Sequence, residues 1–191
     1  MKILVACERS GIVRDAFRER GHDAVSCDLA PSESPGPHII GDVRPLLRES
    51  WDMVIACPPC TYLTVARAPL RDLPETAAAV HFFLKCLWAN SPLVCVENPL
   101  QFRAVRKYVG EPAQKIHPYQ FGDLYLKRTC LWLKGLPPLL ATHYQGTDVM
   151  LPSLVGGTNS RRAGRPALYR TSAERSRFHP GVAKAMAQQW G

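Results

Sequence analysis

The 191-residue chain lacks any long apolar run, and this absence bears on where the protein resides. None of its apolar stretches approaches the roughly 18 residues that a membrane-spanning helix needs. The opening "MKILVACERSG" has too short an apolar part, and becomes charged too early, for a secretory signal peptide. We therefore expect a cytoplasmic protein with no membrane partner.

The sequence also lacks the pattern of a disulfide framework. Its seven cysteines are odd in number and irregularly spaced, and several lie within apolar runs, namely Cys7, Cys57, Cys95 and Cys130. Buried free cysteine behaves as a small hydrophobic residue, and such usage is typical of a reducing compartment. A chain of this length is expected to fold as one domain without disulfides or a metal.

Acidic residues are fewer than basic ones, 16 against 24, so the formal net charge is +8. A basic excess favours nucleic acid or another polyanion as a partner. The excess is greatest in residues 158–178, where one acid accompanies six arginines: Arg161, Arg162, Arg165, Arg170, Arg175 and Arg177. We interpret this segment as a nucleic-acid-binding lobe, and a solvated basic loop is the alternative interpretation.

What the chain does have is an alternation of short apolar strands with helices. Strands are predicted at 2–7, 22–28, 38–43, 51–57 and 92–99, and helices at 11–21 and 73–90. This order predicts an α/β fold with a doubly wound, mostly parallel sheet. Ligands of such sheets gather at the carboxyl ends of the strands. Polar residues follow these ends: Glu8, Asp28, Asp42, the segment from Cys57 to Cys60, Glu97 and Asn98.

The pattern changes after residue 110. The segments "KIHPYQFG" and "TCLWLKG" alternate like strands and predict an antiparallel edge. We therefore divide the chain into a catalytic core (1–134), a short basic lobe or loop (135–177) and a helix that returns to the core (178–191).

The stretch "ACPPCTYL" offers three chemical interpretations. A thioredoxin-like redox pair would need Cys-x-x-Cys at the start of a helix, and "TYLT" gives no clear helix start. Structural zinc needs about four ligands, and the chain has no second Cys-x-x-Cys, so we predict no metal site. The third interpretation is a nucleophilic cysteine held on a loop that Pro58 and Pro59 stiffen. An incidental pair of cysteines is the purely structural alternative.

A nucleophilic cysteine requires an acid partner, and "VENP" supplies one. Glu97 follows the neighbouring predicted strand and should lie at the same edge of the sheet as Cys60. Partial burial there would raise the pKa of its carboxyl toward a range useful for proton transfer. A simple loop cap or an ion pair with a lysine is the structural alternative for Glu97.

Together these segments resemble the DNA (cytosine-5) methyltransferases, most closely their small phage- or prophage-encoded members. "PPCTYL" and "VENP" are similar to the family's Pro-Pro-Cys and Glu-Asn elements. Further similar elements are "VACERSG", "IIGDV", "QFGDLYLKRTCLWLKG" and the terminal "HPGVAKAMAQQW". The first of these retains one glycine, Gly11, of a glycine-rich turn, and the third retains one arginine, Arg128. The resemblance implies a Rossmann-like S-adenosylmethionine-dependent methyltransferase fold with a very small target-recognition lobe.

The resemblance also implies specific roles. Cys60 would add to carbon 6 of a cytosine flipped out of duplex DNA, Glu97 would act at N3 and Arg128 at O2. Residues implied to bind S-adenosylmethionine are Glu8, Ser10, Gly11, Asp28, Leu29, Asp42, Val43 and Pro58. Arg161, Arg162, Arg165 and Arg170 would contact DNA phosphates. Two alternatives stay open: the same adduct chemistry on RNA, a nucleotide or a modified base or with another transferred group, and a non-catalytic DNA-binding protein.

Overall fold

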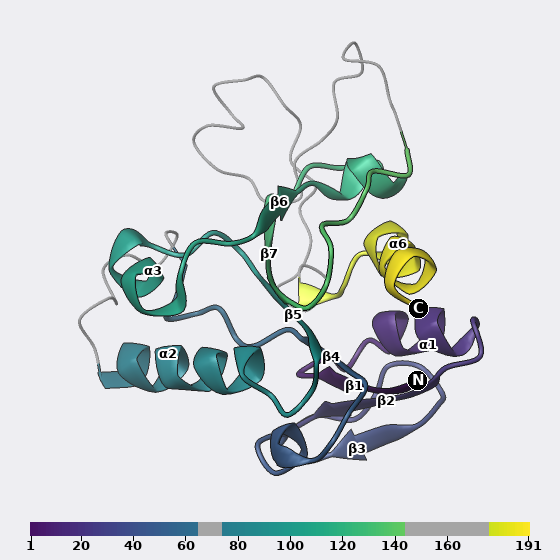
Figure 1. The fold of residues 1–191 in the computed structure, drawn as a ribbon, viewed down its shortest axis with the longest axis horizontal. Helices are drawn as coiled ribbons and strands as arrows, with labels where there is room; N and C mark the ends of the chain where they lie inside the picture. The colour runs from purple at the N-terminus through teal and green to yellow at the C-terminus, as the bar shows by residue number, and fades with distance from the viewer. Residues whose placement is uncertain (65–73, 144–175) are drawn as a thin grey trace.

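The computed structural model describes residues 1–64, 74–143 and 176–191 (Figure 1). Its core is a seven-stranded sheet in the order β3-β2-β1-β4-β5-β7-β6. The strands are β1 Lys2–Ala6, β2 Asp23–Asp28, β3 His38–Ile40, β4 Met53–Ala56, β5 Leu93–Asn98, β6 Gln114–Ile116 and β7 Thr129–Lys134. The helices are α1 Ile12–Arg18, α2 Pro74–Leu87, α3 Arg103–Val109 and α6 Pro180–Trp190, with 3-10 turns η1 Leu46–Arg48 and η3 Pro118–Phe121.

The strand directions confirm the doubly wound, mostly parallel sheet that the sequence predicts. Strands β3, β2, β1, β4 and β5 pair in parallel, whereas β7 runs antiparallel to both β5 and β6. The antiparallel edge is therefore also confirmed. Its segment "KIHPYQFG" is only partly a strand, because Pro118 has no N–H to donate to a ladder and instead begins η3.

Alternation along the central strands divides the core into two layers. In β1, Ile3 and Val5 face a cluster that includes α1 and α6, whereas Leu4 and Ala6 face a cluster that includes α2 and α3. Figure 1 shows α1 and α6 together on one side of the sheet, with α2 and α3 on the other. Both faces of β1 and β4 are covered, which explains their continuous apolar sequences.

Helix α3 was not among the predicted elements. It has only seven residues, and its buried side chains are Val105 and Val109, one turn apart. Two apolar positions at a spacing of four are too few to reveal a helix in sequence. The predicted helices at 11–21, 73–90 and 178–191 are present with shorter bounds, as α1, α2 and α6.

The C-terminal helix α6 packs on the same layer as α1. Its Val182, Ala183 and Met186 are fully buried, and the indole N–H of Trp190 donates to the carbonyl of Pro137 at 3.0 Å. Leu139 is also buried in this layer, so the described part of 135–143 lies against the core. No helix within the described ranges is long and apolar enough to cross a bilayer.

A buried arginine fixes the loop that follows β2. The side chain of Arg14 is fully buried and forms an ion pair with Asp15 at 2.7 Å. Its guanidinium donates to the hydroxyls of Ser26, Ser32 and Ser34 and to the carbonyls of Ser34 and Pro35. This network ties α1 to the loop 30–37 at the carboxyl edge of the sheet.

Arg14→Met should destabilise the fold by about 3 kcal/mol, because it removes a buried charged donor and leaves its acceptors unpaired. Arg18→Met, on the next turn of α1, is the matched control. Its side chain is 41% exposed and 4.0 Å from Asp23. The Arg18→Met control should lower the free energy of unfolding by less than about 0.5 kcal/mol. Urea denaturation of both variants measures the difference, and equal midpoints would contradict the role assigned to Arg14.

Candidate functional site

The candidate site lies at the carboxyl edge of the sheet, where β1, β2, β4 and β5 end. The last parallel pairs are Ala6 with Ala56 and Ala56 with Val96. One residue further, Cys57 and Glu97 emerge side by side from β4 and β5. Because β7 is antiparallel to β5, its first residues lie at this same edge, with Cys130 opposite Asn98.

The loop 57–60 is held by hydrogen bonds from several directions. The backbone N–H of Cys57 donates to the carbonyl of Ala6 at 2.9 Å. The carbonyl of Cys60 accepts the N–H groups of Leu63 and Thr64 at 3.0 and 3.2 Å. The side-chain amide of Asn98 donates to the carbonyl of Pro58 at 2.8 Å. The Glu-Asn segment after β5 therefore holds the loop that carries Cys60.

The residues after Cys60 do not continue as the helix that a thioredoxin-like site requires. Residues 61–63 form a turn, and Thr64 then makes an isolated bridge with Gln101. All seven cysteines are free thiols. In the described part of the chain, no group of three or more His, Cys, Asp or Glu side chains could hold a metal ion.

Burial dominates the protonation of both proposed catalytic groups. It raises the pKa of the Cys60 thiol, and the nearby Glu97 carboxylate raises it further. Burial also raises the pKa of Glu97, which is half-buried at the end of β5. The Lys127 ammonium opposes both shifts, lowering the pKa of Cys60 and of Glu97. These three side chains therefore form one electrostatic cluster.

The surroundings of Cys57 and Cys60 act differently on the pKa values of the two thiols. The pKa of Cys57 lies well above its ordinary value because of burial, with Glu97 and then Glu8 adding to the shift. A thiolate forms more readily at Cys60, which has Lys127 near it. The electrostatics thus favour Cys60 over Cys57 as a nucleophile.

Sequence reasoning selected Arg128 and missed Lys127. The side chain of Arg128 is exposed, whereas Lys127 and Thr129 both act on the carboxyl of Glu97. Arg128 lies between these two residues in the chain, with its side chain exposed just before β7. The available signal was the basic pair at 127 and 128, which precedes the strand that pairs with "VENP".

A cavity of about 460 Å³ lies beside this cluster, at the ends of β1, β2 and β3. Four residues predicted to bind the cofactor line it: Asp28, Leu29, Asp42 and Val43. Pro59 and one face of α2, formed by Ala78, His81, Phe82 and Lys85, complete much of its wall. The Asp42 carboxylate pairs with Arg44 at 2.6 Å, and these contacts lower the pKa of Asp42.

The other predicted cofactor residues are not among those that line this cavity. Pro58 is buried behind its exposed neighbour Pro59. Glu8 and Ser10 are buried in the turn after β1, where the Ser10 hydroxyl donates to the Glu8 carboxylate. Gly11 has a φ of 76°, and an added Cβ there would collide with Arg14 and Ser34.

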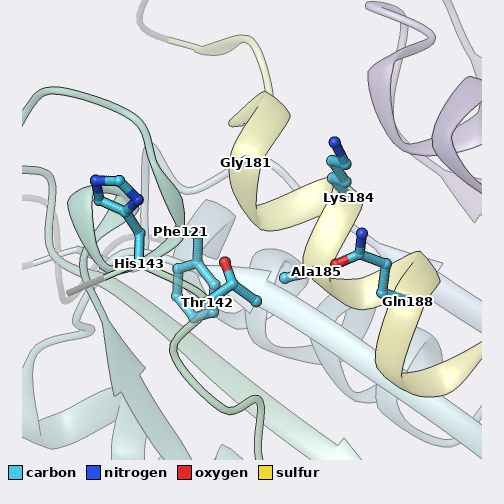
Figure 2. Close-up of a pocket in the computed structure, with 7 residues that line it drawn as sticks. All are labelled: Phe121, Thr142, His143, Gly181, Lys184, Ala185 and Gln188. Carbon is cyan, nitrogen blue, oxygen red and sulfur yellow. The ribbon is translucent and has the colours of Figure 1, made fainter.

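A second hollow, of about 300 Å³, lies away from these residues. Figure 2 shows its wall, formed by residues of η3, the segment 142–143 and α6. The lining residues include Phe121, His143, Gly181 and Lys184, and none of the predicted site residues is among them. The predicted phosphate-contacting residues Arg161, Arg162, Arg165 and Arg170 lie outside the described residues.

Comparison with known proteins gives structural neighbours only. No family model and no curated protein matches the sequence. One solved structure is a prophage-encoded protein of Escherichia coli assigned as a DNA modification methyltransferase, with a TM-score of 0.45 and 14% identity. The match covers 81% of this chain and 51% of that one. An rRNA methylase from Escherichia coli matches with a TM-score of 0.39 and 14% identity, over 69% of this chain and 56% of that one.

The chain thus spans about half the length of the two solved structures. Likenesses of this degree assign neither a reaction nor a substrate, so both must come from the chemistry of the site itself. The site consists of a thiol, a carboxyl and an ammonium at the ends of neighbouring strands, beside a nucleoside-sized cavity.

The Lys127 ammonium should control the reactivity of Cys60. Lys127→Met should slow alkylation of Cys60 by iodoacetamide about threefold to tenfold at pH 8, because the pKa of the thiol rises further above its ordinary value. Peptide mass spectrometry resolves Cys60 from the other cysteines and gives the rate.

Arg128→Met is the matched control, since it removes the same charge from the adjacent residue. It should leave the rate within about twofold. In the wild type, the rate should increase with pH from 7 to 9, because the raised pKa of Cys60 keeps the thiol protonated over this range. Equal slowing by the two variants would show that the net charge of the protein, and not Lys127 in particular, governs the reactivity of the Cys60 thiol.

Proposed function

We propose that this protein is an S-adenosylmethionine-dependent methyltransferase that acts on carbon 5 of cytosine in DNA. The observation that carries the proposal is the cluster of Cys60, Glu97 and Lys127 at the ends of β4, β5 and β7. Carbon 5 of cytosine is a weak nucleophile, and a neighbouring thiol with an acid partner is the combination that activates it.

The proposed reaction begins with the thiol. Cys60 gives its proton to solvent, and its electron pair forms a bond to carbon 6 of the ring. The π electrons of the 5,6 double bond then become available at carbon 5. Glu97 is suited to donate a hydrogen bond or proton to N3, because its raised pKa favours the protonated carboxyl. After methylation, a base removes the proton of carbon 5 and the thiolate leaves.

Two basic groups have proposed roles in this reaction. The exposed Arg128 stands at the start of β7, at the same edge as Cys60, and is proposed to contact O2. Lys127 favours the thiolate before the adduct forms. The Asn98–Pro58 hydrogen bond restrains the loop that carries the thiol, and Asn98 is the neighbour of Glu97 in the chain.

The cavity beside the cluster fits S-adenosylmethionine as the cofactor. Asp28 is the last residue of β2, the position from which an acid binds ribose hydroxyls in other doubly wound folds. Leu29, Val43 and Phe82 offer apolar surface for adenine, and the Asp42 segment lies beside them. When bound, this cofactor supplies an electrophilic methyl group.

A cytosine within a duplex cannot reach Cys60, because the thiol is itself partly buried. The base must leave the helix, at a cost of a few kcal/mol. Contacts between DNA phosphates and Arg161, Arg162, Arg165 and Arg170 are proposed to offset this cost.

Nucleoside mass spectrometry tests the reaction. Wild-type protein incubated with unmodified duplex DNA and S-adenosylmethionine should produce 5-methylcytosine. Cys60→Ser should lower the product at least about 1,000-fold, since the weaker nucleophile cannot form the adduct efficiently, while cofactor binding persists. Cys57→Ser, three residues away, is the matched control and should keep substantial activity.

Loss of product in the Cys57 variant alone would contradict the choice of nucleophile. Product on single strands, RNA or mononucleotides, without product on duplex DNA, would replace the proposed substrate. Absence of product and of cofactor binding together would favour a non-catalytic protein with this fold.

The salt dependence of DNA binding tests the arginine segment. Each phosphate contact contributes about 0.9 to the slope of log K against log salt, so Arg161→Ala with Arg162→Ala should reduce the slope by up to about 2. The control is Arg20→Ala with Arg48→Ala. This variant also removes two exposed positive charges, but from the segments before β2 and β4, at the amino ends of the strands and away from Cys60. Fluorescence anisotropy over a salt series gives the slopes, and an equal change in both variants would refute the assignment.

A further inference from the structure

Two arginines share one carboxylate at the carboxyl edge of the sheet. Oε1 of Glu33 pairs with Nη2 of Arg9 at 2.7 Å, and Oε2 of Glu33 pairs with Nε of Arg177 at 2.6 Å. Arg9 lies in the turn that follows β1, Glu33 in the loop that follows β2, and Arg177 just before α6. Three segments that are far apart in the sequence therefore meet in one charged group, the Arg9–Glu33–Arg177 cluster.

This cluster carries one positive charge more than its acid neutralises. The other ion pairs within the described residues match one arginine with one acid: Arg14 with Asp15, Arg18 with Asp23, Arg44 with Asp42 and Arg106 with Glu111. In the Arg9–Glu33–Arg177 cluster, two guanidiniums share one carboxylate. Together they present about ten N–H donors, whereas a carboxylate has about four acceptor sites, so the cluster can bind a second anion.

The acid of the cluster is held in place by its own loop. The backbone N–H of Glu33 donates to the carbonyl of Arg9 at 2.7 Å. Its neighbours Ser32 and Ser34 accept hydrogen bonds from the buried guanidinium of Arg14. Glu33 thus presents its carboxylate from a fixed position and orients both guanidiniums before a ligand arrives. The side chains of Arg9 and Arg177 are nevertheless 42% and 53% exposed, so a ligand in solution can reach them.

The position of the cluster indicates a backbone phosphate as the ligand. Arg9 follows the end of β1, at the same edge of the sheet as Cys60, which follows the end of the neighbouring parallel strand β4. Arg177 belongs to the arginine-rich segment 158–178. A cytosine that reaches Cys60 brings the phosphates of its own strand to this edge, and guanidinium groups match the oxygen geometry of a phosphate.

We propose that Arg9 and Arg177 together bind a backbone phosphate of the DNA substrate, an inference that rests on the proposed action on DNA. Glu33 orients the two guanidiniums and leaves one net positive charge for the anion. The same carboxylate repels the phosphate, so the site binds it less tightly than two arginines alone would. The sign of this effect is what a substitution of Glu33 measures.

The salt dependence of DNA binding tests the site. Arg9→Gln should weaken binding of an unmodified duplex about threefold to tenfold at low salt, and it should reduce the slope of log K against log salt by about 0.9, the contribution of one phosphate contact. Arg18→Gln is the matched control, because its side chain is 41% exposed and stands at the last residue of α1, near the start of β2. The control should change the slope by less than about 0.2. Fluorescence anisotropy over a potassium chloride series gives both slopes.

Glu33→Gln gives a second test of opposite sign. It should tighten DNA binding about twofold or more, because the repulsion is removed while the amide oxygen still accepts from an arginine. Weaker binding by this variant would overturn the inference, since the arginines would then serve only to hold the loop.

Calorimetry with S-adenosylhomocysteine separates the phosphate from a carboxylate of the cofactor as the ligand. Arg9→Gln should bind this compound within about twofold of the wild type. Weaker binding of S-adenosylhomocysteine with an unchanged salt slope would overturn the inference, as would equal slope changes in Arg9→Gln and Arg18→Gln. A wild type that binds no DNA would refute the proposed DNA substrate as well, whereas unchanged DNA binding by Arg9→Gln would refute this site alone.

Discussion

The hydrogen bond from Asn98 to the carbonyl of Pro58 joins the two strand ends on which the proposed chemistry depends. Parallel pairing of β4 and β5 delivers Cys57 and Glu97 to one edge, but it does not fix the three residues that follow Cys57. The side-chain amide of Asn98 holds Pro58, the N–H groups of Leu63 and Thr64 hold the carbonyl of Cys60, and the two prolines limit the conformations that the loop can adopt. Without this restraint, the distance between the Cys60 thiol and the Glu97 carboxyl would vary with the loop.

The same burial that shapes the site works against its nucleophile. Taking Cys60 and Glu97 out of water raises both pKa values, which helps an acid and hinders a thiolate. The Glu97 carboxylate also disfavours the ionisation of Cys60. Lys127 resolves part of this conflict because its charge favours both anions, and it reaches the edge only because β7 runs opposite to β5.

Charged side chains surround the proposed cofactor cavity at the ends of β1, β2 and β3, and most of them are paired with one another. Arg14 is bonded to Asp15 and to the loop 30–37, and its charge also lowers the pKa of the Glu8 carboxyl. Arg44 is paired with Asp42. Of the acids at the strand ends of β1 to β3, Glu8 is the most buried, with its Oε2 unpartnered among the described contacts.

The sequence by itself determined the order of the elements, the parallel sheet and the edge at which Cys60, Glu97 and Asp28 lie. These features follow from local periodicity and from the rule that parallel strands share their carboxyl ends. Tertiary structure decided the rest. Lys127 and Thr129 approach Glu97 through pairing between strands some thirty residues apart, and the seven-residue α3 is stabilised by packing that its short pattern does not reveal. The unpartnered oxygen of Glu8 is likewise invisible in sequence, because hydrogen-bond satisfaction depends on which side chains the fold brings within reach.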